Sequence, residues 1–459
     1  MTDAAAPVAN EERIFALDLI RGVALLGIFI MNMPGFVASF YSGMVGFHQW
    51  PAWWDQWVEL LRNVLLGGKF NSMFSFLFGV GFTIQLVRLL EHDAARGHVI
   101  YVRRLLALLA FGVLHACLLW TGDVLHIYAL LGFLLLLLRN ASDRSIVTLI
   151  VLCIIGPPLI SLGRLMLAIP DDYTLAAHVF QRWQTSNNAA YGHGSFLDAA
   201  REHTREMVFL YTDPGSLSYV LSFYLQMITT MLIGVLAGRH RWVQRAAQHR
   251  SGMIAWQWSM LTVGLLSGAV YAYGETHELL LGDSLWTVVT SFAYVLCRLG
   301  LVTFYVISLL RLILRERWQS RLKPIAIVGR MPLSNYLLQS VMATFIFYGW
   351  GLGYWNQGGP TAWFALALFL YVVVQIPLSA WWLERFRYGP MEYLWRLLTY
   401  GYGSLSRTPV LAAAVMVSTD GAPPIAATDA ADPAQPDSPE VSANPDTSSR
   451  DSGAGTSAY

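Results

Sequence analysis

The chain has little charge and few cysteines for its length. Only 13% of its 459 residues are charged, 55% are hydrophobic, and the mean hydropathy is +0.47. This composition excludes a soluble domain with a single anchor and is typical of a protein that crosses the membrane several times. The formal net charge is +1, so the overall balance gives no reason to expect nucleic acid as a partner.

The chain also lacks the features of a disulfide framework, a metal site or a cleaved leader. Cys117, Cys153 and Cys297 all lie in apolar runs without motif spacing, which is typical of small buried side chains. Residues 1–12 are polar and acidic, and no basic region precedes a short apolar core with a small-residue cleavage site. We therefore expect the first apolar stretch to be retained as a membrane span.

Long apolar runs predict an all-α fold, a polytopic transmembrane helical bundle with about ten spans. Each run is long enough to cross a hydrocarbon core of roughly 30 Å. The predicted spans are 15–37, 66–90, 101–120, 123–139, 145–168, 217–238, 252–274, 285–312, 327–349 and 361–384.

Basic residues set the predicted orientation. The short connections near 120–123, 274–284 and 350–360 contain no Lys or Arg, whereas the connections on the other side are rich in them. Because basic loops stay in the cytoplasm, we expect both termini to be cytoplasmic, in a multi-pass protein of a bacterial-type inner membrane. The basic connections contain Arg88, Arg96, Arg103, Arg104, Arg139, Arg144, Arg239, Arg241, Arg245, Arg250, Arg311, Arg315, Arg317, Arg321 and Lys323.

Two segments lie outside the predicted bundle. Residues 1–407 form the expected membrane domain, which includes a polar extracytoplasmic excursion at 170–215. Within that excursion, 198–207 has the pattern of a short amphipathic helix at the interface. Residues 408–459 are rich in Ala, Asp, Pro and Ser, so we expect a disordered cytoplasmic tail.

The first span carries ionic and polar residues on one face. With about 100° per residue, Arg21 lies roughly 60° from Asp18, and Asn32 only about 20° from Arg21. A charge near the bilayer centre costs at least a few kcal/mol, and pairing of Asp18 with Arg21 lowers that cost. One interpretation is a salt bridge that locks helix packing. The other, which we prefer, is a polar cavity that opens toward one membrane face.

The third and fourth spans form a hairpin with polar residues near its turn. Gly122-Asp123 is a turn signal, so His115 lies in the membrane just below it, and Arg104 lies eleven residues earlier on the same stripe. A buried neutral imidazole is a competent general base, which Asp123 or Tyr128 could orient. The alternatives are a histidine bonded to a neighbouring helix and an aspartate that caps the fourth span.

Three further positions stand out, along with a second histidine. His126 is the weaker histidine candidate, since it could face headgroups or solvent. Lys69 opens the second span on the predicted outer side, where we weigh interfacial snorkelling against a role in the site. Asn335 and Gln339 share a face of the ninth span, and helix–helix hydrogen bonding is the commoner use of such amides.

Four motifs in the same order resemble the YeiB-like family, also described as domain of unknown function 418. The match spans roughly residues 13–400. The motifs are Arg13…Leu17-Asp18…Arg21-Gly22…Asn32; His115…Trp120-Thr121-Gly122-Asp123…Tyr128; Val328-Gly329-Arg330-Met331…Asn335-Tyr336-Leu337-Leu338-Gln339; and Phe386-Arg387-Tyr388-Gly389-Pro390-Met391-Glu392-Tyr393-Leu394-Trp395-Arg396.

This family is distantly similar to the transmembrane acyltransferases, which move an acyl group from cytoplasmic acyl-CoA to an acceptor on the far side. The resemblance implies that Arg21 helps to hold the donor, whose phosphates suit arginine. The chain departs from the O-acetylating branch, where a catalytic histidine stands eleven residues after that arginine. Asn32 occupies this position and cannot act as a base, so His115 is expected to take the role.

Together these observations predict an integral membrane acyltransferase that uses acyl-CoA (acetyl-CoA) as donor substrate and no metal. His115 is the expected base and Asp123 its partner, and Asn32 or Lys69 stabilises the oxyanion. The donor is expected near Arg21, Arg103, Arg104 and Arg330, with Asp18, Tyr128, Asn335 and Gln339 in support. Expected partners are membrane lipid and a small-molecule or glycan acceptor, with a homodimer left open. The alternatives are a transporter or exporter of a small anionic molecule and a non-catalytic partner of an envelope-modifying enzyme.

Overall fold

The computed structural model describes residues 10–39, 50–92, 94–167, 173–243, 245–277 and 284–401, and within them it contains helices and no strands. The predicted tail, 408–459, lies outside the described residues. The helices are α1 (Asn10–Val37), α3 (Trp53–Leu61), η1 (Arg62–Leu66), α4 (Lys69–His92), α5 (Ala94–Leu118), α6 (Leu125–Leu137), η2 (Leu138–Asn140), α7 (Asp143–Met166), α8 (Tyr173–Gly192), α9 (Phe196–Thr212), α10 (Pro214–Arg239), η3 (Ala246–His249), α11 (Arg250–Thr276), α12 (Leu285–Ile313), α13 (Glu316–Gly329), α14 (Pro332–Phe347), α15 (Pro360–Phe369), η4 (Leu370–Gln375), α16 (Ile376–Arg385) and α17 (Pro390–Tyr400).

Eight helical runs among the described residues are long and apolar enough to cross a membrane. They confirm a polytopic helical bundle. Two of the ten expected spans correspond to shorter helices, the apolar helix Leu125–Asn140 and the 16-residue α14. The second span is longer than expected, since the apolar run begins at Trp53 and continues through α3, the π-helical η1 and α4.

Glycines allow the spans to approach closely. A methyl group on Gly79 of α4 would lie 2.0 Å from the Met231 carbonyl oxygen of α10, and one on Gly329 of α13 would lie 1.8 Å from the Asp18 carbonyl oxygen of α1. In lipid no hydrophobic force drives helices together. Van der Waals contact between closely packed backbones is therefore a main source of helix association. These contacts bring α1, which carries the ionic face, directly against α13.

The expected ninth span at 327–349 is wrong as a continuous helix. The chain breaks at Arg330 and Met331, between α13 and α14. A residue of α17 stabilises the break. The carboxylate of Glu392 accepts hydrogen bonds from the first amides of α14, those of Leu333 and Ser334. This carboxylate satisfies helix amides that a continuous helix would have bonded internally.

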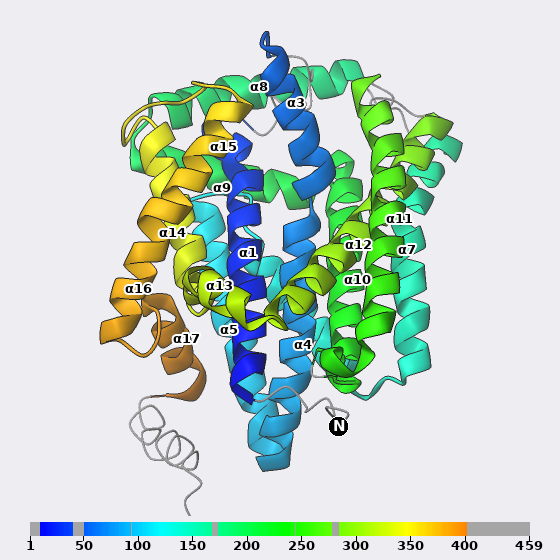
Figure 1. Cartoon of the computed structure of the whole chain (residues 1–459). Helices are drawn as coiled ribbons and strands as arrows, with labels where there is room; N and C mark the ends of the chain where they lie inside the picture. The colour runs from blue at the N-terminus through cyan, green and yellow to red at the C-terminus, as the bar shows by residue number, and fades with distance from the viewer. Residues whose placement is uncertain are drawn as a thin grey trace, which may run out of the picture. The chain divides into compact units, whose positions relative to one another are not determined.

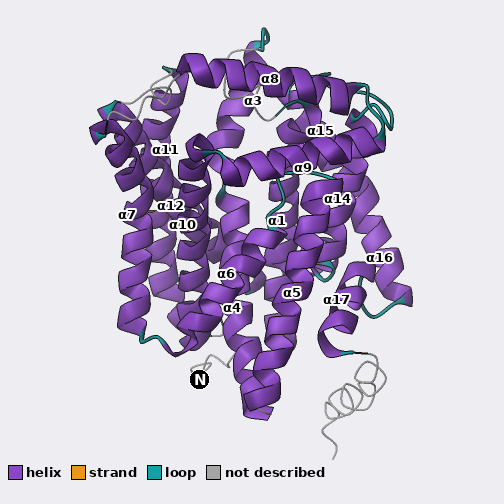
Figure 2. Ribbon diagram, turned by 180° about the vertical axis from the view of Figure 1, so that it is seen from behind, coloured by secondary structure: helices purple, strands orange, loops and turns teal. Residues whose placement is uncertain are grey.

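The excursion at 170–215 contains two helices that cross one end of the bundle, α8 and α9 (Figures 1 and 2). The segment predicted to be helical, 198–207, lies within the longer α9, which begins with a capping box between Ser195 and Asp198. At the opposite end lie the start of α1 and the whole of α17 (Figure 1). We call the α8–α9 end the outer end, following the predicted orientation, and the opposite end the inner end.

Candidate functional site

A serine, a histidine and an aspartate are aligned near the outer end of the bundle. His115 of α5 places its Nδ1 2.9 Å from Asp123 Oδ1 and its Nε2 2.8 Å from Ser340 Oγ of α14. All three residues are at most 3% exposed. Ser340 is not among the residues predicted from the sequence, because 225 positions separate it from His115 and only the packing of α14 on α5 unites them.

The hydrogen bonds determine how protons are arranged in this group. Burial opposes ionisation of Asp123, but hydrogen bonds from His115 and His126 outweigh it and hold the pKa of this carboxyl below its ordinary value. An ionised carboxylate only accepts hydrogen bonds, so His115 donates from Nδ1. In the neutral ring, Nε2 then accepts the hydroxyl hydrogen of Ser340. This is the protonation pattern of a base poised to activate a hydroxyl group.

His126 is part of the same group, and the expectation that it could face headgroups or solvent is wrong. It is 3% exposed, and both its backbone amide and its Nδ1 bond to Asp123 Oδ2, at 2.9 and 2.8 Å. Asp123 therefore both caps the start of α6 and holds two imidazoles. His126 Nε2 lies 2.6 Å from the Tyr211 hydroxyl of α9, and Tyr211 lies 2.9 Å from the Tyr224 hydroxyl of α10.

The local sequence allows this arrangement because a glycine faces the hairpin. A methyl group on Gly112 of α5 would lie 2.2 Å from the His126 backbone nitrogen and 2.8 Å from Asp123 Oδ2. Any larger residue would separate α5 from α6. Tyr128 does not orient His115, because its hydroxyl donates to the Asn71 carbonyl of α4 at 3.0 Å.

Of the three predicted residues of the first span, two form a contact with each other and the third does not join them. Arg21 and Asp18 form an ion pair of 2.8 Å, with side chains 30% and 10% exposed. Asn32 is partly exposed, and its side chain forms no hydrogen bond with His115 or with another described residue. Its predicted role in stabilising an oxyanion has no contact in support.

The predicted donor-binding arginines lie toward the inner end of the bundle. Arg104 stacks on the Trp395 ring at 3.8 Å and lies within electrostatic reach of Arg21 and Arg396. Arg330 is close enough to Asp18 for the two charges to attract each other. Arg103 and Arg330 are exposed. The structure thus places Arg104 near two further cations, Arg21, which was predicted, and Arg396, which was not, where α5 packs on α17.

Three further predicted residues are displaced from His115. Lys69 is 0% exposed, which excludes interfacial snorkelling, and its Nζ lies 3.2 Å from the Asn63 carbonyl oxygen. It lies inside the long second run and not at its end. Asn335 and Gln339 bond to η4 and α16 through Gln375 and Ser379, the helix–helix use that is common for such amides.

A second polar cluster lies between the hairpin turn and the outer helices. Glu206 of α9 accepts from Thr121 and Tyr191 at 2.8 Å each and from Asn187 of α8 at 2.7 Å. Both hydroxyl hydrogens therefore point to Glu206. The Nδ1 of His203, 3.0 Å from the Thr121 hydroxyl and 2.9 Å from that of Tyr191, must then be the donor. Thr121 stands two residues before Asp123, so this cluster adjoins the Ser340–His115–Asp123 group.

Three buried atoms in the second cluster and on the neighbouring Glu202 have no hydrogen-bond partner among the residues that the structure describes. They are Asn187 Oδ1, Glu202 Oε1 and His203 Nε2. The two oxygens are acceptors, and Nε2 of His203 is also an acceptor when the ring is neutral with its hydrogen on Nδ1. Buried polar atoms are ordinarily paired, so the cluster has acceptor capacity for a ligand that carries several N–H or O–H groups.

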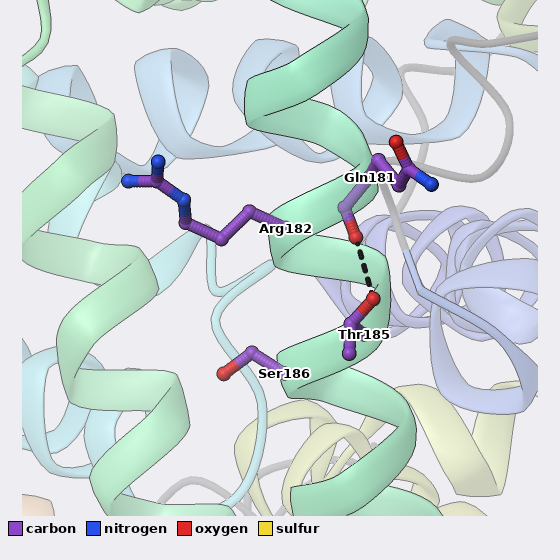
Figure 3. Close-up of a pocket in the computed structure, with 4 residues that line it drawn as sticks. All are labelled: Gln181, Arg182, Thr185 and Ser186. Carbon is purple, nitrogen blue, oxygen red and sulfur yellow. Dashed lines mark hydrogen bonds between the residues drawn. The ribbon is translucent and has the colours of Figure 1, made fainter.

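A shallow hollow of about 480 Å³ opens on α8. Gln181, Arg182, Thr185 and Ser186 line it, and the Thr185 hydroxyl donates to the Gln181 carbonyl (Figure 3). It contains none of the residues of the Ser340–His115–Asp123 group, so we attach no chemistry to it. No group of three or more His, Cys, Asp or Glu in the described part of the chain could hold a metal ion.

Comparisons with known proteins place the chain among bacterial relatives. It is 33% identical over 410 residues to the uncharacterized protein YxaH of Bacillus subtilis (strain 168), covering 86% of this chain and 96% of YxaH. It is 29% identical over 427 residues to the uncharacterized protein YeiB of Escherichia coli (strain K12), covering 84% and 96%. No solved structure matches. The family described as "Protein of unknown function (DUF418)" matches residues 237–402. The chain therefore belongs to the DUF418 family of membrane proteins, which includes YxaH and YeiB.

Proposed function

We propose that the protein is an integral membrane acyltransferase that moves an acyl group from cytoplasmic acyl-CoA to an extracytoplasmic hydroxyl or amine acceptor. The observation that carries the proposal is the alignment of Ser340, His115 and Asp123 at 2.8 and 2.9 Å. The same arrangement of hydroxyl, imidazole and carboxylate activates the nucleophile in unrelated acyl-transfer enzymes.

The reaction proceeds in two displacements. Ser340 Oγ attacks the thioester carbonyl while His115 Nε2 accepts the hydroxyl proton. The C–S bond then breaks, His115 returns the proton to the leaving sulfur, and the acyl group is held as an ester on Ser340. In the second displacement His115 deprotonates the acceptor, whose oxygen or nitrogen attacks the ester, and the proton returns to Ser340 Oγ. Asp123 holds the ring and stabilises the imidazolium in both displacements.

The donor and the acceptor approach from opposite ends. The cations Arg21, Arg104 and Arg396 at the inner end suit the phosphates of acyl-CoA. The unpaired acceptor atoms of Asn187, Glu202 and His203 at the outer end suit an acceptor rich in hydroxyl or amine hydrogens. Between them lies the Ser340–His115–Asp123 group.

The test is CoA release from acetyl-CoA by the detergent-purified protein. We expect one acetyl group per protein to be trapped on Ser340 without acceptor, and turnover once a crude envelope extract is added. Ser340→Ala and His115→Ala should each abolish both the trapped acetyl and the turnover. Thr344→Ala is the matched control, because it removes a buried hydroxyl one helical turn from Ser340. Equal CoA release by wild type and both site variants would refute the proposal.

A second candidate is a proton-coupled transporter of a small anionic molecule. It is favoured by the chain of hydrogen bonds from Ser340 through His115, Asp123 and His126 to Tyr211, which has the form of a proton relay across the outer half of the bundle. A cysteine introduced at Asn32 would then label from one membrane side or the other according to substrate. Labelling that never varies would exclude this route.

A further inference from the structure

Two cations are buried inside the bundle, one at the start of α4 and one in α12. Lys69 begins α4 and is 0% exposed, and Arg298 of α12 is 1% exposed. The ring of Tyr294 lies 5.3 Å from Lys69 Nζ, and the two cations lie within electrostatic reach of each other. We call Lys69 and Arg298 the buried cation pair.

The buried cation pair has fewer hydrogen bonds than it can make. Arg298 Nη1 donates to Ser72 Oγ at 2.8 Å and to the Gln226 carbonyl at 2.9 Å, but Nε and Nη2 have no acceptor among the described residues. Lys69 Nζ donates to the Asn63 carbonyl at 3.2 Å and also interacts with the Cys297 thiol. A guanidinium has five N–H donors and an ammonium three, so several of these donors have no acceptor in the described part of the chain.

Neither member of the pair forms an ion pair with a carboxylate of the described residues. Other arginines of the bundle do, since Arg21 pairs with Asp18 and Arg239 with Asp143, both at 2.8 Å. An uncompensated charge in a poorly solvated interior is strongly unfavourable. Its presence indicates that a counter-charge belongs at this position.

Among the described residues, the charged groups around the pair leave a single positive charge in excess when the two nearby carboxylates are ionised. Glu59 lies 3.5 Å from Arg62, and Glu275 accepts a hydrogen bond from Asn63. These two carboxylates balance two of the three cations of the region, Arg62 and the buried cation pair. The start of α4, after Gly68 with a φ of +70°, adds the positive end of a helix dipole.

We propose that the buried cation pair binds an oxyanion, the carboxylate or phosphate group of a small molecule or of a lipid. A single excess positive charge suits a group with one negative charge, and the free N–H donors of Arg298 suit two oxygens at once. The site is separate from the Ser340–His115–Asp123 group, because the two sets of hydrogen-bonded residues have no member in common. Ser72 faces Arg298, whereas the Asn71 carbonyl accepts from Tyr128 on the hairpin side. The proposal is independent of acyl transfer.

Thermal unfolding of the detergent-purified full chain tests this site, with sodium acetate, inorganic phosphate and phosphatidic acid as probes. We expect at least one probe to raise Tm by roughly 2–4 °C at saturation. A shift with acetate or phosphate identifies a free oxyanion, and a shift with phosphatidic acid alone identifies a lipid phosphate. No shift with any of the three would overturn the proposal.

The variants separate binding from folding. Arg298→Leu should lose the probe-dependent shift and raise Tm without probe, because it removes an uncompensated buried charge. Lys69→Met should weaken probe binding at least about tenfold through loss of one charge contact. Arg239→Leu is the matched control, which should lower Tm by breaking its pair with Asp143 and keep the probe shift. Ser340→Ala should also keep the shift, so failure of the acyltransferase proposal leaves this one standing. A full probe shift in Arg298→Leu, or a fall in its probe-free Tm, would refute it.

Discussion

The substitution Asp123→Asn should separate the structural and chemical parts of the site. The carboxylate accepts three hydrogen bonds, one from His115 on Oδ1 and two from His126 on Oδ2. An asparagine can turn its oxygen to His126 and keep two of them. Its NH₂ group then faces His115 Nδ1, which must become an acceptor, so the proton moves to Nε2. The ring can no longer accept the proton of Ser340.

The expected magnitudes follow from this exchange. The two hydrogen bonds from His126 lose their charged acceptor, and the bond from His115 is replaced by one that the asparagine NH₂ donates. The free energy of unfolding should therefore fall by about 2–4 kcal/mol. Acetyl-CoA turnover should fall by about 10³–10⁴-fold, the loss seen when such a histidine is held in the wrong tautomer. Asp198→Asn is the control, because Asp198 is about half exposed and asparagine serves as well as aspartate near a helix start.

The stability difference should also depend on pH with a defined sign. The folded-state pKa of Asp123 is depressed, so its stabilisation is fully present above the unfolded pKa of about 3.9 and is lost as pH falls through the folded pKa. Unfolding followed by tryptophan fluorescence should show the wild type and Asp123→Asn converging as pH is lowered from 5 to 3. Two curves that stay parallel over this range, or a variant as stable and active as the wild type, would refute the reasoning.

Two further predictions concern packing and capping. Gly329→Ala should lower the free energy of unfolding by about 3 kcal/mol, since its methyl would lie 1.8 Å from the Asp18 carbonyl oxygen, whereas Gly81→Ala, with open space around it, should not. An equal effect of the two in denaturant unfolding would contradict the close α1–α13 contact. Glu392→Ala should cost about 1–2 kcal/mol through loss of the cap on α14, against under about 0.5 kcal/mol for the control Glu384→Ala, whose side chain is 74% exposed. Stabilities that agree for these two would exclude the capping role.

Much of the site was predictable wherever partners are close in sequence. Asp18 and Arg21 are three residues apart on one helix, so their ion pair follows from helical geometry. Asp123 lies in a turn eight residues after His115. Because the turn is short, the chain passes back beside the end of the helix that carries His115, so the two side chains are close. The assignment of His126 failed because its exposure depends on α9 and α10, which contribute Tyr211 and Tyr224.

Composition and the distribution of basic residues determined that this chain is a helical membrane protein, because lipid requires runs of apolar residues and internally bonded backbone. The rotation per residue of a helix also placed the polar groups of α1 and of α5 on particular helix faces. The tertiary structure alone decided which faces meet. Ser340 reaches His115, Glu392 caps α14, and Arg298 faces Lys69, each across more than fifty residues. A helical periodicity specifies the direction of a side chain from its own axis, and it carries no information about the neighbouring helix.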